Sequence, residues 1–206
     1  YADADLPEER KVDLLTIQLE AFADFSRFTG VEGVDWESAY GTYHALESES
    51  YTGNLITNIF AGGTVDTERA FLTGYTDLWN FRTNTNSYGW YFGSQGYTVE
   101  GSHPSYDWFY NRRNVNGYLG IPTYYFLENR YSELSPVTIA PDSILFQEIY
   151  NLYAANRDGA GGPYFSFNVT YQGHGPYDTE EVWRGDHYTD GRYSTETANI
   201  VDNYLG

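Results

Sequence analysis

The sequence predicts an α/β fold, in which a mainly parallel central sheet lies between two layers of helices. Short apolar runs typical of buried strands alternate along the chain with segments typical of helices, and this alternation favours a layered α/β architecture. The strand candidates are also largely apolar along their whole length, as expected for strands covered on both faces. No stretch approaches the ~18 uninterrupted apolar residues that a membrane span needs.

Each predicted element has its own local signal. Three segments have the apolar, β-branched or aromatic content of buried strands, and each ends at a polar or glycine-containing turn: residues 12–19, 97–100 and 164–170. One helix is expected over residues 87–95. A second helix is expected to start after Pro141, with Asp142 or Ser143 as N-cap, and to stop near Gly159. The polar segment 178–203 is expected to be mostly loop.

Composition limits the possible partners. The formal net charge is −18, with one lysine among 11 basic residues against 29 acidic ones, so the chain should repel polyanions and nucleic acid is excluded as a partner. Handling phosphate would require local positive charge, from a divalent cation and one or two arginines. The chain has no cysteine, which excludes disulfides and thiolate metal sites.

We expect one domain over residues 1–206, because this length suits a single hydrophobic core. The chain opens on a polar run without a methionine, which predicts a piece of a longer protein whose membrane anchor lies outside it. The piece itself is expected to be soluble.

Three potential ligands follow predicted strands. Glu20, His103 and His174 each lie just past the carboxyl end of one. In parallel sheets ligands bind at this edge, so these side chains are expected to converge there. For Glu20, capping of a following helix is an equally good interpretation.

Thr64 has two possible roles. It follows two glycines, and its spacing from Glu68 fits a helix N-terminus with a capping box. Alternatively, a hydroxyl beside a metal at a helix N-terminus can act as a nucleophile on phosphorus. Residues 101–114 combine His103 with aromatic residues and arginines, which suits phosphate and a glycerol chain but also an ordinary core and surface.

Four motifs together resemble the extracellular domain of lipoteichoic acid synthases and related phosphoglycerol transferases. The resemblance spans about residues 10 to 180, and its order and spacing are more specific than any single motif. The motifs are Ile17-Gln18-Leu19-Glu20-Ala21-Phe22, Gly63-Thr64-Val65-Asp66-Thr67-Glu68, Glu100-Gly101-Ser102-His103 with Phe109-Tyr110-Asn111-Arg112, and Gln172-Gly173-His174-Gly175-Pro176-Tyr177. It implies an alkaline phosphatase or sulfatase-like three-layer fold.

The resemblance also implies roles for these residues. Glu20 and Thr64 would be ligands of a divalent metal, most readily Mn²⁺ with Mg²⁺ or Zn²⁺ as alternatives, and Thr64 would also be the nucleophile. His174 would contact the phosphoryl group or protonate the leaving oxygen. His103, Tyr110 and Arg112 would bind substrate, with tyrosine where the family commonly has tryptophan.

The family completes its metal site with an Asp-His pair that follows a further apolar strand. Asp186-His187 mimics this pair but follows a polar segment, so we interpret it as coincidental. We therefore expect a C-terminally incomplete catalytic domain that binds manganese weakly by itself.

The implied activity is transfer of phosphoglycerol from phosphatidylglycerol-type lipids, during synthesis of a lipoteichoic acid-like or other glycerol-phosphate polymer. The expected location is the extracellular face of a bacterial cell membrane. One alternative is a sulfatase or phosphodiesterase on the same scaffold, although a threonine rather than cysteine at position 64 favours phosphorus chemistry. Another is a catalytically incomplete fragment that binds glycerol phosphate.

Overall fold

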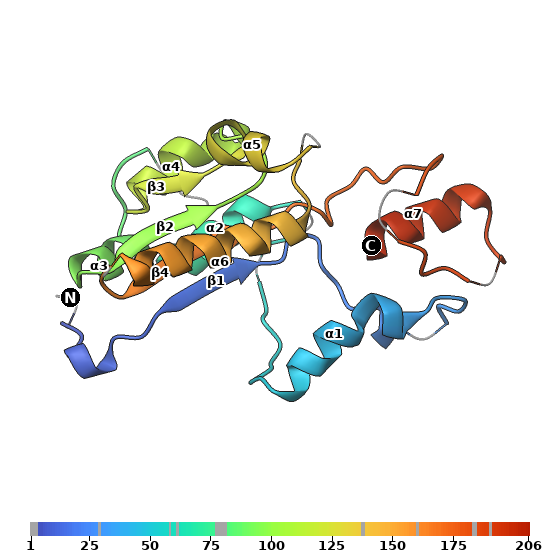
Figure 1. Ribbon diagram of the computed structural model, residues 1–206, viewed down its shortest axis with the longest axis horizontal. Coiled ribbons are helices and arrows are strands. Elements are labelled where there is room, and N and C mark those ends of the chain that lie inside the picture. Colours follow the sequence, from blue (N-terminus) through green and yellow to red (C-terminus); the bar gives the residue numbers. More distant parts are fainter. Residues whose placement is uncertain are drawn as a thin grey trace. The chain divides into compact units, whose positions relative to one another are not determined.

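The chain forms two compact units, which are described separately (Figure 1). The structure is a computed structural model that describes residues 4–28, 30–57, 59–60, 62–76, 82–136, 139–159, 161–182, 185–189 and 191–206. The first unit comprises Tyr1–Glu20 and Thr57–Gln172, and the second comprises Ala21–Ile56 and Gly173–Gly206. The expectation of one domain over residues 1–206 stays a prediction.

A four-stranded parallel sheet is the centre of the first unit. Its strands are β1 (Leu14–Gln18), β2 (Thr98–Ser102), β3 (Thr123–Tyr125) and β4 (Tyr164–Val169), in the order β1-β4-β2-β3. Strand β4 is buried along its whole length, whereas burial alternates along the edge strand β1. Because all strands run in the same direction, their carboxyl ends meet at one edge of the sheet.

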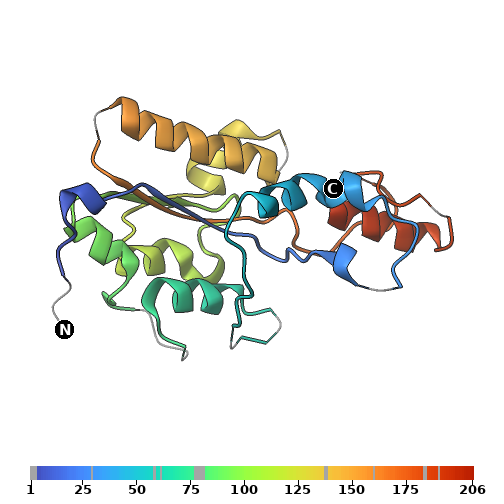
Figure 2. The same ribbon diagram turned by 90° about the horizontal axis from the view of Figure 1, so that it is seen from below.

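Helices cover both faces of this sheet. Figure 2 shows α6 on one face and α2, α3 and α4 on the other. The helices of the first unit are α2 (Thr64–Thr73), α3 (Tyr88–Ser94), α4 (Arg112–Tyr118), α5 (Ser132–Leu134) and α6 (Asp142–Asp158). Short helical turns lie at Glu8–Arg10, Phe109–Asn111 and Leu127–Tyr131. The predicted α/β fold with a parallel sheet between helical layers is confirmed.

The helical layers enclose two apolar clusters. The larger joins the side chains of β2 and β4 to Leu72 of α2 and Leu119 after α4, and the smaller packs Leu145 and Ile149 of α6 on Tyr131. The long predicted helix is present and ends before Gly159, but its N-cap is Pro141 rather than Asp142 or Ser143. The helix and strands expected around residues 87–100 and 164–170 are also present.

The second unit has helices α1 (Trp36–Ser48) and α7 (Thr195–Leu205) and a short helical turn at Phe25–Arg27. Asp35 caps α1 by accepting from the Ser38 amide, and Ser194 caps α7 by accepting from the Thr197 amide. The expectation that residues 178–203 are mostly loop is therefore wrong where α7 lies. Within the described parts of the chain, no helix combines the length and apolar character required to cross a bilayer.

Candidate active site at the carboxyl edge of the sheet

Glu20 is held at the carboxyl edge of the sheet by the ends of β1 and β4. It is buried two residues beyond β1, and its amide donates to the Thr170 hydroxyl at 2.8 Å. The Thr170 amide in turn donates to the Gln18 carbonyl at 3.0 Å. These two hydrogen bonds extend the pairing of β1 with β4 beyond the last residues of both strands and fix the Glu20 backbone. The structure thus places Glu20 at a strand end, as the sequence predicts.

Thr64 directs its hydroxyl at Glu20. Its Oγ1 donates to Glu20 Oε1 at 2.6 Å, and its carbonyl accepts from Gln18 Nε2 at 3.4 Å. Thr64 is the first residue of α2, whose N-cap is Gly63, and no side chain caps this end. The helix-cap interpretation of Thr64 is therefore wrong, because its hydroxyl bonds to a carboxylate on another element.

Gly63, which precedes Thr64, has little room for a side chain. A Cβ at Gly63 would lie only 2.1 Å from Ile59 Cγ2. A larger residue at position 63 would therefore require the Ile59 side chain to move. The backbone turn places Thr64 at the helix N-terminus, where the first amides lack intrahelical acceptors and the helix dipole favours negative charge.

His103 is buried at the end of β2 and held at both ring nitrogens. Nδ1 lies 3.0 Å from the Val169 carbonyl, and Nε2 lies 3.1 Å from Nη1 of Arg112. A carbonyl only accepts and a guanidinium only donates, so the network assigns the proton to Nδ1 and leaves Nε2 as the acceptor. His103 is thereby oriented as a neutral ring.

Arg112 is paired with Glu68, a carboxylate that the sequence analysis considered only as part of a capping box. Its Nε and Nη2 donate to the two carboxylate oxygens of Glu68 at 3.1 and 2.5 Å, and both side chains are buried. Burial by itself lowers the pKa of Arg112, but the hydrogen bonds and charge of Glu68 outweigh it, so the pKa is raised. The guanidinium carbon lies 5.2 Å from the centre of the Tyr110 ring, within cation–π range.

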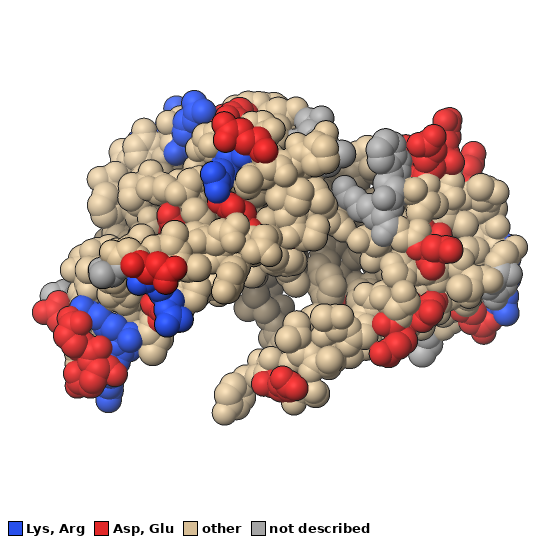
Figure 3. Space-filling model, in the orientation of Figure 1, with Lys and Arg blue, Asp and Glu red and all other residues tan. Residues whose placement is uncertain are grey.

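Glu20 and His103, two of the three residues expected to converge, are therefore brought to one edge of the sheet together with Thr64 and Arg112. Tyr110 joins them with a left-handed backbone, at φ 55°. Glu68 was missed because it lies 44 residues from Arg112 and its spacing from Thr64 was attributed to a capping box. Figure 3 shows acidic side chains at several separate points of one face, in a chain with 29 acidic and 11 basic residues.

His174 belongs to the second unit, where its Nδ1 lies 2.5 Å from the Gly175 carbonyl. Its participation in the site stays a prediction. Asp186 is exposed, and the His187 amide donates to Asp202 Oδ1 at 2.7 Å. Across the described ranges, no three or more His, Cys, Asp or Glu side chains are arranged to hold a metal ion.

Comparison with known proteins identifies the fold. No protein-family model matches the chain. The lipoteichoic acid synthase LtaP from Listeria monocytogenes superposes with a TM-score of 0.72 over 96% of this chain, at 19% identity. The phosphoglycerol transferase GacH from Streptococcus pyogenes, solved with sn-glycerol-1-phosphate, gives 0.69 over 98%, at 16% identity. The chain has the sulfatase-like fold of the lipoteichoic acid synthases.

This sulfatase-like fold extends to a more distant structure. An alkaline phosphatase superfamily protein from Vibrio parahaemolyticus gives a TM-score of 0.60 over 95% of this chain, at 16% identity. The chain spans 50%, 56% and 48% of the three structures. In sequence, it is 26% identical over 204 residues to a putative cyclic beta-1,2-glucan modification protein from Rhizobium meliloti, covering 94% of this chain and 30% of that protein.

Proposed function

We propose that this chain carries the nucleophile half of a metal-dependent phosphoglycerol transferase, with Thr64 as the nucleophile. The supporting observation is the 2.6 Å contact between the Thr64 hydroxyl and the Glu20 carboxylate, at the N-terminus of α2 and the carboxyl edge of the sheet. A fold shared with a phosphoglycerol transferase makes phosphorus the expected centre of attack. The expected donor is a phosphatidylglycerol-type lipid at the outer face of a bacterial membrane.

In the proposed reaction, Glu20 Oε1 takes the proton from Thr64 Oγ1, and this oxygen attacks the phosphorus of the lipid. A bond forms between Oγ1 and phosphorus, and the bond from phosphorus to the diacylglycerol oxygen breaks. We assign protonation of that leaving oxygen to His174. In the second step the acceptor hydroxyl gives its proton to His174 and attacks phosphorus, the bond from Oγ1 to phosphorus breaks, and Glu20 returns its proton to Thr64 Oγ1. Water in place of the acceptor would give hydrolysis.

The donors present suit a hard divalent cation. Glu20 and Thr64 supply oxygen ligands, which Mn²⁺ and Mg²⁺ prefer, so these two residues would hold the metal. A bound cation would lower the pKa of the Thr64 hydroxyl and offset the phosphoryl charge. Two protein oxygens leave a hard cation largely hydrated, so we expect weak binding by this chain, which calorimetry with MnCl₂ can measure.

Substrate binding is assigned to the group around Arg112. His103 presents its Nε2 toward Arg112, and Tyr110 supplies a ring on which a glycerol chain can pack. Glu68 neutralises part of the Arg112 charge, so this arginine would bind phosphate through its remaining donors rather than as an isolated cation. It is 1% exposed, so almost none of its surface is open to solvent.

The acceptor has two candidates. A growing glycerol-phosphate polymer is the one that the lipoteichoic acid synthase fold suggests. A glycan is favoured by the relative from Rhizobium meliloti, whose name describes modification of a cyclic beta-1,2-glucan. Both acceptors would use the same Thr64 intermediate.

Trapping the intermediate tests this function. The chain is incubated with Mn²⁺ and vesicles of phosphatidylglycerol, and intact mass spectrometry should reveal one added phosphoglycerol, located on Thr64 by peptide mapping. Thr64→Ala should show no adduct, while Thr67→Ala, on the same helix, should retain it. An adduct that persists in Thr64→Ala, or its absence in the unmodified chain when diacylglycerol is released, would refute the assignment.

A further inference from the structure

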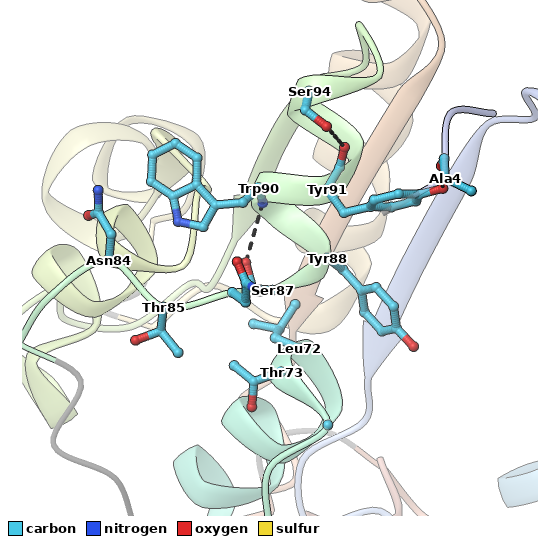
Figure 4. Close-up of a pocket in the computed structure, with 12 residues that line it drawn as sticks. Ala4, Leu72, Thr73, Asn84, Thr85, Ser87, Tyr88, Trp90, Tyr91 and Ser94 are labelled. Carbon is cyan, nitrogen blue, oxygen red and sulfur yellow. Dashed lines mark hydrogen bonds between the residues drawn. The ribbon is translucent and has the colours of Figure 1, made fainter. Parts of the chain in front are cut away.

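The first unit contains a cavity of about 770 Å³ that the proposed chemistry does not use (Figure 4). It lies between the end of α2, the segment before α3 and α3 itself. Its lining residues are Ala4, Leu72, Thr73, Gly74, Asn84, Thr85, Asn86, Ser87, Tyr88, Trp90, Tyr91 and Ser94. The volume is within the range of sites for small organic ligands.

The lining is chemically selective. None of the described residues that form it is charged, although 19% of the chain is charged and the net charge is −18. Its polar groups are hydroxyls and amides, and its large side chains are aromatic. A phosphate or a metal ion would find no opposite charge here, so the lining favours a neutral ligand with many hydroxyl groups and apolar C–H faces.

Trp90 offers a fixed aromatic surface. Its indole is 43% exposed, yet Nε1 donates to the Tyr118 carbonyl at 2.8 Å. The same carbonyl accepts from the Thr85 amide at 3.0 Å, so the segment before α3 and the Trp90 indole are held by one acceptor. Gly120 lies against the indole, where a Cβ would approach the ring to 2.7 Å. A half-exposed tryptophan held in this way loses little further conformational freedom when it binds a ligand.

The other side of the cavity is held in a similar way. Tyr88 is 46% exposed and packs on Phe71 and Phe92, with ring centres 5.7 and 6.0 Å away. The Tyr91 hydroxyl donates to the Ala4 carbonyl at 3.0 Å. Figure 4 shows the rings of Tyr88 and Trp90 on either side of Ser87. Aromatic surfaces thus flank a strip of hydroxyl and amide groups.

We propose that this cavity binds a neutral oligosaccharide, with Trp90 packing against the C–H face of a sugar ring and Asn84 and Thr85 meeting its hydroxyls. Sugars combine an apolar face with a hydroxyl rim, which matches the aromatic and amide lining. Thr73, at the cavity, and Thr64 are nine residues apart on α2, or roughly 13 Å along its axis. Given the proposed function, the occupant is the acceptor glycan, bound at a distance that an oligosaccharide can span.

Calorimetric titration of the chain with a β-1,2-linked gluco-oligosaccharide tests the proposal. Saturable binding is expected, and Trp90→Ala should weaken it by roughly two- to twelvefold, the range expected for loss of one aromatic contact. Asn84→Ala changes an exposed side chain and should weaken binding without affecting the fold. Trp108→Ala removes a tryptophan that is 63% exposed outside the cavity, and it should leave binding unchanged. Circular dichroism confirms that each variant is folded.

Three results would overturn the proposal. The first is the absence of binding by the unmodified chain. The second is binding that Trp90→Ala and Asn84→Ala leave unchanged, since the ligand would then lie elsewhere. The third is equal competition by glycerol phosphate, which would exclude a neutral-sugar site. Because the titration needs neither metal nor lipid, its failure is separable from failure of the Thr64 adduct experiment: glycan binding can be present without the adduct, and the adduct without glycan binding.

Discussion

Glu68 shows how one residue can organise several others. Its carboxylate holds two donors of Arg112, which leaves Nη1 directed at His103, whose other nitrogen is held by the Val169 carbonyl. Three side chains, from α2, the start of α4 and the end of β2, are thus connected in one buried hydrogen-bond network. Removing any member would leave the others with unsatisfied polar groups.

We expect Glu68→Ala to lower the free energy of unfolding by about 3–5 kcal/mol, because it leaves the buried Arg112 charge unpaired. Asp66→Ala is the control on the same helix. Asp66 lies 3.8 Å from Arg69, and both side chains are more exposed than Glu68 and Arg112, so the loss of this longer contact should cost less, about 1 kcal/mol. Denaturant titration measures both. A cost for Glu68→Ala as small as for Asp66→Ala would show that the pair stabilises little.

The double variant Glu68→Leu with Arg112→Met separates charge from packing. Replacing both members of a buried pair by apolar side chains is often close to neutral, so it should be much more stable than Glu68→Ala. We expect it to bind no phosphoglycerol, because the charge is gone although the fold remains. Retained binding would remove Arg112 from the substrate site.

At the scale of elements, two glycines near the end of α4 should respond in opposite directions. Gly120 has φ 74°, and a Cβ there would lie 2.5 Å from the Trp90 amide nitrogen, so Gly120→Ala should cost about 2 kcal/mol or more. Gly117 lies within α4 with nothing within 4 Å of its Cβ position, so Gly117→Ala should stabilise by about 0.5–1 kcal/mol. Thermal melting checks both, and equal signs would contradict this account.

The way in which an element is buried determines whether its sequence predicts it. β1, β4 and α6 have apolar patterns and were predicted close to their observed bounds. α7 was not, because its buried face is polar: Asn199, Asp202 and Asn203 bond to backbone groups of the preceding loop. The polar composition of residues 178–203 therefore favoured a loop over a helix. β3 has three residues, too few for a pattern.

Some contacts of the candidate site could likewise be predicted from the sequence, and others could not. Glu20 and Thr64 could be predicted as neighbours, because a strand end and a glycine-preceded helix start meet at one edge of a parallel sheet. The Glu68–Arg112 pair and the uncharged cavity could not, because both depend on side chains distant in sequence whose partners only the tertiary structure selects.

At the scale of the whole molecule, each unit has its own polar network. In the second unit, Asp24 accepts from Ser26, Arg27 and His44. Burial raises the pKa of Asp24, but these hydrogen bonds outweigh it and leave the pKa well below its usual value. A lowered folded-state pKa stabilises the fold above the unfolded value of about 3.9, and this stabilisation is lost as the pH falls.

Asp24→Asn should therefore destabilise the second unit at neutral pH, and the difference from the unmodified chain should shrink below about pH 4. Hydrogen exchange at pH 7 should show lost protection in α1 and little change in α6. Glu49→Gln, an exposed carboxylate at the end of α1, is the control and should change neither. A difference in stability that is constant from pH 7 to pH 3 would contradict the role of the Asp24 charge.

Strand β1 lies at the edge of the sheet, and two of its side chains, Leu15 and Ile17, are 41% and 39% exposed. Such an edge offers backbone donors and acceptors together with apolar surface, and a second copy of the same strand satisfies both. The chain should therefore associate with itself as its concentration rises, which sedimentation velocity detects. Ile17→Lys should stay monomeric at concentrations where the unmodified chain associates. Leu46→Lys, on α1, is the control and should still associate. Equal association of all three proteins would show that the associating surface is not β1.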